Sequence, residues 1–228
     1  MSPVRARSRR GEGDRLREEI LDAVGTLLDE TNDESAVSIR AIADRVGVSP
    51  PSIYRHFEDK DALLSAVCAD VFAQLQIGIA DAVADASDPV DALTKAGRCY
   101  IEFGLQHPEH YRLVFMCTPT RPIPVTRDEL IGGLAPIALP ETDPVFGGDA
   151  LAGSLAFKAL HDLVSDVLAL VPKRKRPDAF AATTTVWMTV HGVTSLRITK
   201  PDFTWPSLDE QIDVVMWPWR QAVAALRR

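Results

Sequence analysis

The chain has 228 residues, of which 46% are hydrophobic, 25% are charged and 13 are glycine. This composition excludes collagen-like and disordered proteins, and the length fits a small domain joined to a larger one. The net charge of −7 argues against a protein that binds nucleic acid through its overall charge.

The first 17 residues form a basic segment, with six arginines against two acidic side chains. Almost no apolar residue precedes Leu16, so residues 1–14 are predicted to be a flexible arm. The following stretch, residues 18–37, carries seven acidic side chains and no basic one. Positive charge in this part of the chain is therefore concentrated in the arm.

Apolar residues at helical spacing predict four helices after the arm. Ser38 and Ser49 are suited to cap the second and third helices, and Gly47 supplies a left-handed turn between them. Pro50 and Pro51 fall in a first turn, where N–H groups have no helical partner. The predicted helices cover residues 16–28, 39–46, 50–57 and about 60–75.

The rest of the chain is also predicted to be helical, since no stretch alternates with period 2. Prolines interrupt residues 118–148, which are expected to be irregular except for a short helix near 126–134. The other predicted helices lie near 89–106, 108–116, 149–171, 177–198 and 207–227. The predicted fold is all-α, with a three-helix head on a larger helical body.

Residues 38–60 have the layout of a helix-turn-helix. At 100° per residue, Ser49, Ile53 and Phe57 are expected to face the core. The outward and flanking positions are Pro51, Ser52, Tyr54 and Arg55. A guanidinium beside hydroxyl groups suits the major groove of DNA, where arginine pairs with guanine and hydroxyls meet phosphate.

The stretch from about Ile20 to Leu64 resembles the N-terminal DNA-binding domain of the TetR family of bacterial repressors. The resemblance rests on Ile20-Leu21-Asp22-Ala23, Ser38, Ile42-Ala43, Val46-Gly47-Val48-Ser49, Ile53-Tyr54-Arg55-His56-Phe57 and Lys60-Asp61-Ala62-Leu63-Leu64. It implies that the third helix is the recognition helix and that Tyr54 and Lys60 contact phosphates. The full predicted DNA-binding set is Ser38, Arg40, Ser49, Pro50, Pro51, Ser52, Tyr54, Arg55, His56 and Lys60.

The sequence departs from many relatives by its Pro50-Pro51 pair and by the acidic stretch 29–34. Proline donates no hydrogen bond, so direct base readout narrows to Ser52, Arg55 and His56, with only apolar contact left to the prolines. His56 could equally be a packing residue. The basic arm is predicted to reach phosphates or the minor groove, and the alternative is a solvated tail.

The body carries a weaker likeness to one TetR subgroup, in the Trp-x-x-x-His-Gly pattern of residues 187–192 and in residues 108–115. The resemblance implies an effector-binding and dimerisation domain whose last two helices form the dimer seam, with Pro218 expected to kink or break the last one. His191 could face an effector or the core. The candidate pocket residues are Tyr100, Phe103, Tyr111, Phe115, Phe157, His161, Trp187 and His191.

These inferences predict a homodimeric, ligand-released repressor that binds near-palindromic double-stranded operator DNA and responds to a small apolar or amphipathic effector. The predicted domains are the arm (1–14), the helix-turn-helix domain (15–62) and the effector-binding and dimerisation domain (63–228). The alternatives are a constitutive DNA-binding dimer without an effector, and an effector-binding protein whose head has lost specific readout.

The sequence predicts no catalytic residue, metal or cofactor, because it lacks metalloprotease, hydrolase and phosphate-loop motifs. Its cysteines, Cys68, Cys99 and Cys117, have neither metal nor disulfide spacing. No signal peptide and no uninterrupted apolar run of membrane-spanning length are found. We therefore expect a soluble, cytoplasmic protein with no membrane partner.

Overall fold

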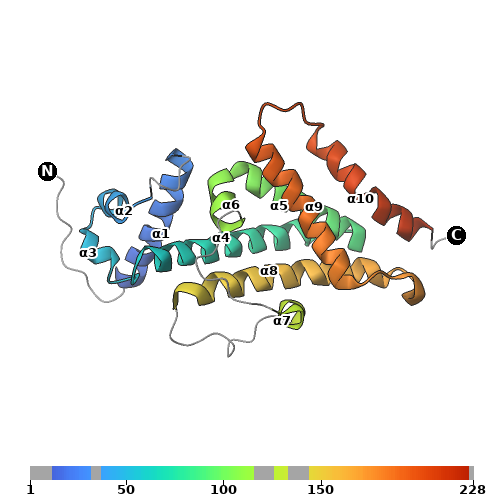
Figure 1. Ribbon diagram of the computed structural model, residues 1–228, viewed down its shortest axis with the longest axis horizontal. Coiled ribbons are helices and arrows are strands. Elements are labelled where there is room, and N and C mark those ends of the chain that lie inside the picture. The colour runs from blue at the N-terminus through green and yellow to red at the C-terminus, as the bar shows by residue number, and fades with distance from the viewer. Residues whose placement is uncertain (1–11, 32–36, 116–125, 133–143, 226–228) are drawn as a thin grey trace. The chain divides into compact units, whose positions relative to one another are not determined.

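A computed structural model describes residues 12–31, 37–115, 126–132 and 144–225. These residues form α-helices and one short 3-10 helix but no strand, which confirms the predicted all-α class (Figure 1). Most of the predicted arm, residues 32–34 of the acidic stretch, Cys117 and most of residues 118–148 lie outside the described residues. The helices are α1 (Glu12–Thr31), α2 (Ile39–Val46), α3 (Pro50–Ile53), α4 (Lys60–Val83), α5 (Pro89–Gln106), α6 (Pro108–Phe115), α7 (Arg127–Gly132), α8 (Pro144–Ala169), α9 (Ala179–Thr199) and α10 (Leu208–Ala224).

The chain divides into two compact units, which are described separately. The first unit comprises residues 1–71, 107–123 and 137–150, and the second comprises residues 72–106, 124–136 and 151–228. The predicted domain boundary between residues 62 and 63 lies inside the continuous helix α4.

The core of the first unit is built by α1, α2, α3, the start of α4 and α6. The apolar stripe of α1 is fully buried at Ile20, Val24 and Leu28. Helix α6 packs against α1, where a Cβ atom at Gly25 would lie 3.1 Å from Nε2 of His110. Glycine at this position therefore leaves room for the His110 imidazole against α1.

Helix α4 requires a correction to the sequence analysis. By length and composition alone it is apolar enough to cross a membrane, with a mean hydropathy of 1.6 over its best window. The sequence shows no uninterrupted apolar run of spanning length here, because the charged residues Lys60, Asp61 and Asp70 interrupt it. The mean hydropathy of the best window nevertheless stays in the range of a membrane-spanning segment. Core helices of soluble proteins share the property, and several large apolar residues of α4 are buried, so the observation is weak evidence for a membrane span.

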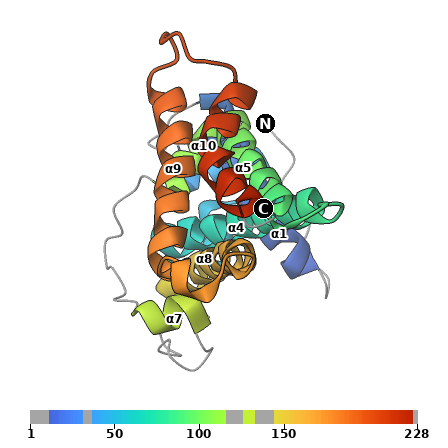
Figure 2. The ribbon, with the colours of Figure 1, turned by 90° about the vertical axis from the view of Figure 1, so that its right-hand side faces the viewer.

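In the second unit α5 packs against both α9 and α10, as Figure 2 shows. Leu93 and Ile101 of α5 and Ile212 of α10 are among the buried residues of this layer. Helix α10 begins with a capping box between Ser207 and Glu210 and continues through Pro218. The expectation was a kink or a break at Pro218, and the break does not occur, because a proline removes one helical hydrogen bond and does not by itself end a packed helix.

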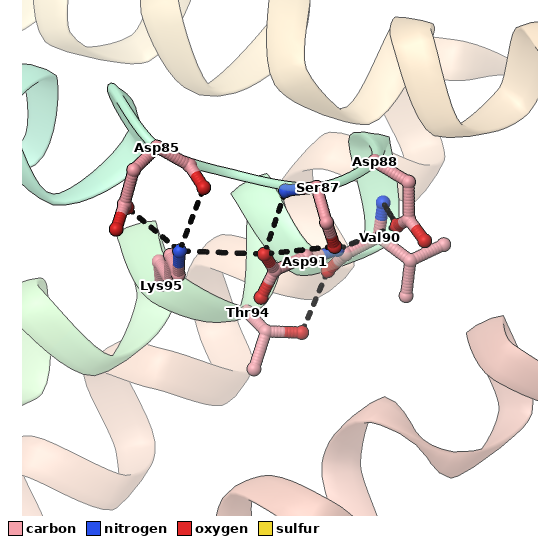
Figure 3. A network of polar contacts seen from close by, with 7 residues as sticks. All are labelled: Asp85, Ser87, Asp88, Val90, Asp91, Thr94 and Lys95. Atoms are coloured by element: carbon pink, nitrogen blue, oxygen red, sulfur yellow. Dashed lines mark hydrogen bonds and ion pairs between the residues drawn. The ribbon is translucent and has the colours of Figure 1, made fainter.

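The junction between α4 and α5 is held by a polar network around Lys95 (Figure 3). The Lys95 ammonium lies 2.8 Å from Asp85 Oδ1 and 3.3 Å from Asp91 Oδ2. Asp91 also accepts hydrogen bonds from the backbone N–H and the hydroxyl of Ser87, and Asp88 caps the start of α5. The network joins the loop to the first two turns of α5.

These contacts predict how acid affects stability. The hydrogen bond from Lys95 lowers the pKa of Asp85, and the backbone N–H of Ser87, with Lys95, lowers the pKa of Asp91. A carboxyl whose folded-state pKa is lowered stabilises the fold above its unfolded value of about 4, and this contribution is lost as the pH falls through the folded value. We expect Lys95→Met to lower the urea midpoint of unfolding at pH 7. Between pH 5 and 2 the urea midpoint of this variant should fall less steeply than that of the unmodified protein.

Lys158→Met is the matched control, since Lys158 forms an exposed ion pair with Asp162 on a single helix. It removes the same charge and should leave the steepness of the acid decline close to that of the unmodified protein. An equal effect of the two substitutions on the acid decline would contradict a specific role for the Lys95 network.

Candidate functional site

The turn between α2 and α3 has the geometry expected of a helix-turn-helix. The hydroxyl oxygen of Ser38 accepts a hydrogen bond from Ala41 N at 3.2 Å and caps α2. Gly47 ends α2 with φ of +75°, in the left-handed region that favours glycine. The Val48 N–H then bonds to the Ala43 carbonyl at 2.9 Å, which turns the chain toward α3.

Helix α3 is shorter than predicted, and its faces differ from those expected. Ile53 and Phe57 are buried as predicted, but Ser52 is also buried while Ser49 is exposed. The prediction assumed a continuous helix through Phe57, whereas α3 ends at Ile53. The segment mixes two i to i+3 bonds, Ser52 N to Ser49 O and His56 N to Ile53 O, with an i to i+4 bond from Phe57 N to Ile53 O. Side chains three residues apart lie close together on either kind of turn.

Three side chains of the recognition segment are aligned in this way and form a continuous chain of hydrogen bonds. Nη2 of Arg55 donates to Oγ of Ser52 at 2.7 Å. Oγ of Ser52 lies 3.1 Å from Oγ of Ser49. The structure therefore brings two of the three predicted readout residues, Ser52 and Arg55, into contact with each other.

The other predicted contact residues lie around this chain. Tyr54 has 52% of its surface exposed, and Arg40, Pro50 and Pro51 are exposed as well. Lys60 is the first residue of α4, where Asp59 caps the helix through the Ala62 N–H at 2.7 Å. Lys60 is half-exposed and follows the recognition segment directly in the chain.

His56 is half-buried and lines a hollow of about 370 Å³ between α1, the α3–α4 turn and α4. The Arg17 guanidinium lies in the same hollow, 5.2 Å from the centre of the Phe57 ring. His56 therefore lines this hollow together with the buried Phe57 and is still partly exposed. The sequence pattern gave no signal for the contact between Arg17 and Phe57.

One basic residue of the helix-turn-helix is neutralised within the fold. The Arg45 guanidinium forms two hydrogen bonds of 2.6 Å with the carboxylate of Glu30. This contact lowers the pKa of Glu30 and joins α2 to the end of α1. Sequence reasoning missed the pair because the partners are fifteen residues apart on different helices. The exposed or half-exposed cations of α2, α3 and the start of α4 outside this pair are Arg40, Arg55 and Lys60.

The predicted pocket residues fall into both compact units. Tyr111 and Phe115 belong to the first, where Tyr111 is fully buried and its ring centre lies 5.0 Å from that of Phe115. The other six belong to the second unit. The structure therefore does not assemble the eight residues within one unit.

Four of the remaining six residues form a connected group on α5, α8 and α9. The ring centres of Phe157 and Trp187 are 6.1 Å apart, and those of Trp187 and His191 are 6.4 Å apart. Nδ1 of His191 lies 3.4 Å from the Tyr100 hydroxyl. Burial lowers the pKa of His191, which keeps its ring neutral at physiological pH. Phe103 lies on α5 and is partly exposed.

His161 is a buried histidine with a satisfied hydrogen bond. Its Nδ1 lies 3.0 Å from the hydroxyl oxygen of Thr183. That hydroxyl donates to the Ala179 carbonyl at 2.8 Å, so Nδ1 of His161 is the donor in the pair. This contact joins α8 to α9.

A hollow of about 380 Å³ lies between α5, α9 and α10 in the second unit. None of the eight predicted pocket residues lines it. Its wall is mostly apolar, and the hydroxyls of Thr94, Thr185 and Thr189 donate to carbonyls of their own helices. Leu93, Gly97 and Ile101 line it from α5 at a spacing of four residues, which is the signal that could have located this wall from the sequence.

Two family models match the chain. The model described as bacterial regulatory proteins, tetR family, matches residues 33–67, and the tetracyclin repressor-like C-terminal domain matches residues 93–215, which is more than half of the chain. Among the described residues, no cluster of three or more His, Cys, Asp or Glu side chains could hold a metal ion.

Two curated relatives are similar to part of the chain. The uncharacterized HTH-type transcriptional regulator YobS of Bacillus subtilis (strain 168) is 21% identical over 112 residues, or 49% of this chain and 58% of that protein. The nucleoid occlusion factor SlmA of Vibrio campbellii (strain ATCC BAA-1116) is 26% identical over 98 residues, or 43% of this chain and 50% of that protein. The matches therefore span about half the length of these relatives.

Solved structures share the fold over nearly the whole chain. A protein with unknown function from Rhodococcus sp. RHA1 has a TM-score of 0.69 and 22% identity, covering 98% of this chain and 100% of that one. A transcriptional regulator of the TetR/AcrR family from Thermobifida fusca YX-ER1 has a TM-score of 0.60 and 17% identity, covering 90% and 96%. From the two family matches, we conclude that the chain belongs to the TetR family of bacterial regulatory proteins, with a helix-turn-helix DNA-binding region and a tetracyclin repressor-like C-terminal domain.

Proposed function

We propose that the protein is a homodimeric repressor that binds a near-palindromic operator in double-stranded DNA and is released by a small apolar or amphipathic effector. The observation that carries the proposal is the helix-turn-helix itself, whose recognition segment exposes Tyr54 and Arg55 beside Lys60. A phenol, a guanidinium and an ammonium on one surface suit phosphate and base contacts in the major groove. The protein would act in the cytoplasm, without a membrane partner.

We assign the proposed roles along the chain as the sequence analysis does. Residues 1–14 are the arm, residues 15–62 bind DNA, and residues 63–228 bind the effector and dimerise. The DNA-binding set remains Ser38, Arg40, Ser49, Pro50, Pro51, Ser52, Tyr54, Arg55, His56 and Lys60. Arg45, which is not in this set, pairs with Glu30.

We propose that α9 and α10 form the dimer seam. Met188 and Leu196 of α9 and Val214 and Trp217 of α10 are apolar and between 48% and 74% exposed. On α9, Met188, Gly192 and Leu196 follow one another at a spacing of four residues, which places them on one face. Exposed apolar residues on neighbouring helices are typical of a surface that a partner covers.

For the effector site we propose the second unit. The rings around His191 and Trp187 support an assignment to the Trp-x-x-x-His-Gly subgroup, and the candidates retained are Tyr100, Phe103, Phe157, His161, Trp187 and His191. Tyr111 is fully buried with Phe115 in the other unit, and a core role is the simpler account of both. The neutral His191 and the aromatic neighbours favour an uncharged or amphipathic ligand over a strongly charged one.

The proposal can be tested with the full-length protein. DNA duplexes selected from a randomised pool would give the operator, and a metabolite panel would then be screened for release of that DNA and for a change in tryptophan fluorescence. Release by a compound that also changes the fluorescence supports the repressor. Fluorescence changes without release contradict the ligand-released mechanism, and the absence of both favours a constitutive DNA-binding dimer.

The salt dependence of DNA binding is predicted to separate the arm from the head. Affinity for DNA falls as salt rises, and Lys60→Ala should make this decline less steep. The magnitude of the slope of log affinity against log salt should fall by about one, because one phosphate contact is removed. Removal of residues 1–11, which leaves α1 intact, should lower the slope by more than one because it removes four arginines. Titration of the selected duplex at several salt concentrations gives both slopes.

Replacement of the four arm arginines by glutamine is the control for chain length. If the charge of the arm causes the change in slope, this variant should show the same salt slope as the truncated protein. An unchanged slope after truncation would show that the arm is a solvated tail.

A further inference from the structure

The two prolines of α3 determine the hydrogen bonding of the hydroxyl groups beside them. Pro50 and Pro51 have no N–H to offer, so the first backbone donor of α3 is Ser52 N, which bonds to the Ser49 carbonyl at 2.7 Å. The Ser49 hydroxyl therefore makes no capping hydrogen bond, although Ser49 stands at the N-cap. It lies 3.1 Å from the Ser52 hydroxyl instead.

The chemistry of the side chains sets the direction of one of these hydrogen bonds. A guanidinium can only donate, so Ser52 Oγ accepts from Arg55. In the contact between Ser52 and Ser49 either hydroxyl can be the donor. When Ser52, which is 7% exposed, donates to Ser49, the hydrogen of the exposed Ser49 hydroxyl is available to an outside acceptor.

This arrangement restricts Arg55 without using all of its donors. One hydrogen bond from Nη2 leaves the other N–H groups of the exposed guanidinium for a ligand. A long side chain that is already held in place loses less conformational entropy on binding. Ser52, held between Ser49 and Arg55, is buried apart from the 7% of its surface that is exposed, which leaves little room for a base or phosphate contact of its own.

We propose that Ser52 is a positioning residue that determines base specificity through Arg55. Its hydroxyl orients the guanidinium toward a guanine edge, and the Ser49 hydroxyl, at the other end of the chain, donates to a phosphate oxygen. The inference rests on the proposed DNA-binding function and replaces a direct DNA contact of Ser52 by an indirect one.

The test compares base preferences of the full-length protein on duplexes selected from a randomised pool. Arg55→Ala should lower the preference at one base pair of each half-site by about 5- to 150-fold. Ser52→Ala should lower the preference at the same base pair, by less than Arg55→Ala, and should add nothing in the double variant. Ser52→Thr, which keeps the hydroxyl, should retain the preference. Equal unfolding midpoints of the variants show that the fold is not the cause.

The outcomes distinguish the inference from the function on which it rests. If the unmodified protein selects no sequence, the proposed function fails and the inference fails with it. If it selects a sequence and Ser52→Ala leaves the preference unchanged, Arg55 needs no positioning and only the inference is overturned. If Ser52→Ala weakens all duplexes equally and its effect adds to that of Arg55→Ala, Ser52 contacts phosphate itself and the inference is likewise overturned.

Discussion

Met188→Asp and Val214→Asp are each expected to convert the proposed dimer to a monomer. Both side chains are largely exposed, 62% and 74%, so neither substitution should destabilise the isolated chain by more than about 0.5 kcal/mol. In a two-fold symmetric seam each aspartate occurs twice, and an unpaired charge buried in an apolar contact costs about 3–5 kcal/mol. The dissociation constant should rise by about 100-fold or more. Sedimentation or light scattering across a concentration series measures the change against the 25.0 kDa chain mass.

Ile77→Asp is the matched control for this experiment. Ile77 is an apolar residue that is 63% exposed, close to the 62% of Met188. It lies on α4 rather than on α9 or α10. It should leave the dimer intact. A monomeric Ile77→Asp protein, or dimeric Met188→Asp and Val214→Asp proteins, would place the seam elsewhere.

Tyr111→Ala is expected to lower the free energy of unfolding by about 3–5 kcal/mol. Tyr111 has no exposed surface and lies on α6, which packs against α1. Truncation would leave a cavity beneath the helix that carries the apolar stripe of Ile20, Val24 and Leu28. Urea denaturation followed by circular dichroism measures the loss.

Phe115→Ala tests whether burial, and not the ring contact, causes the effect. Phe115 is half-buried and shares the aromatic contact with Tyr111, so its truncation should destabilise the protein less. A loss below about 1 kcal/mol for Tyr111→Ala would mean that its side chain borders an open cavity, and not a packed core.

The recognition segment shows which features helical periodicity predicts and which it does not. The caps at Ser38 and Gly47 and the buried positions Ile53 and Phe57 follow from local preferences, and the structure confirms them. The faces of Ser49 and Ser52 did not follow, because the prediction assumed one regular helix through Phe57. Helix α3 ends at Ile53, and the residues around it mix i to i+3 bonds with an i to i+4 bond.

The candidate pocket was harder to predict than the helices that carry it. Periodicity assigned Tyr111 and Trp187 to helices correctly, but it contains no information on which helices meet. Tyr111 is buried with α1, while Trp187 contacts Phe157 and His191 in the other unit. The hollow between α5, α9 and α10 likewise depends on three helices that are distant in sequence.

The whole-chain charge of −7 first argued against nucleic acid, and the sequence already located the positive charge in the arm and in the helix-turn-helix. The all-α class, the capped turn and the family resemblance were also determined by the sequence, because they depend on residues close together along the chain. Only the tertiary structure decided that Glu30 neutralises Arg45 and that α6 packs with α1. Such contacts form between segments far apart in the sequence, and their geometry depends on packing that no local pattern records.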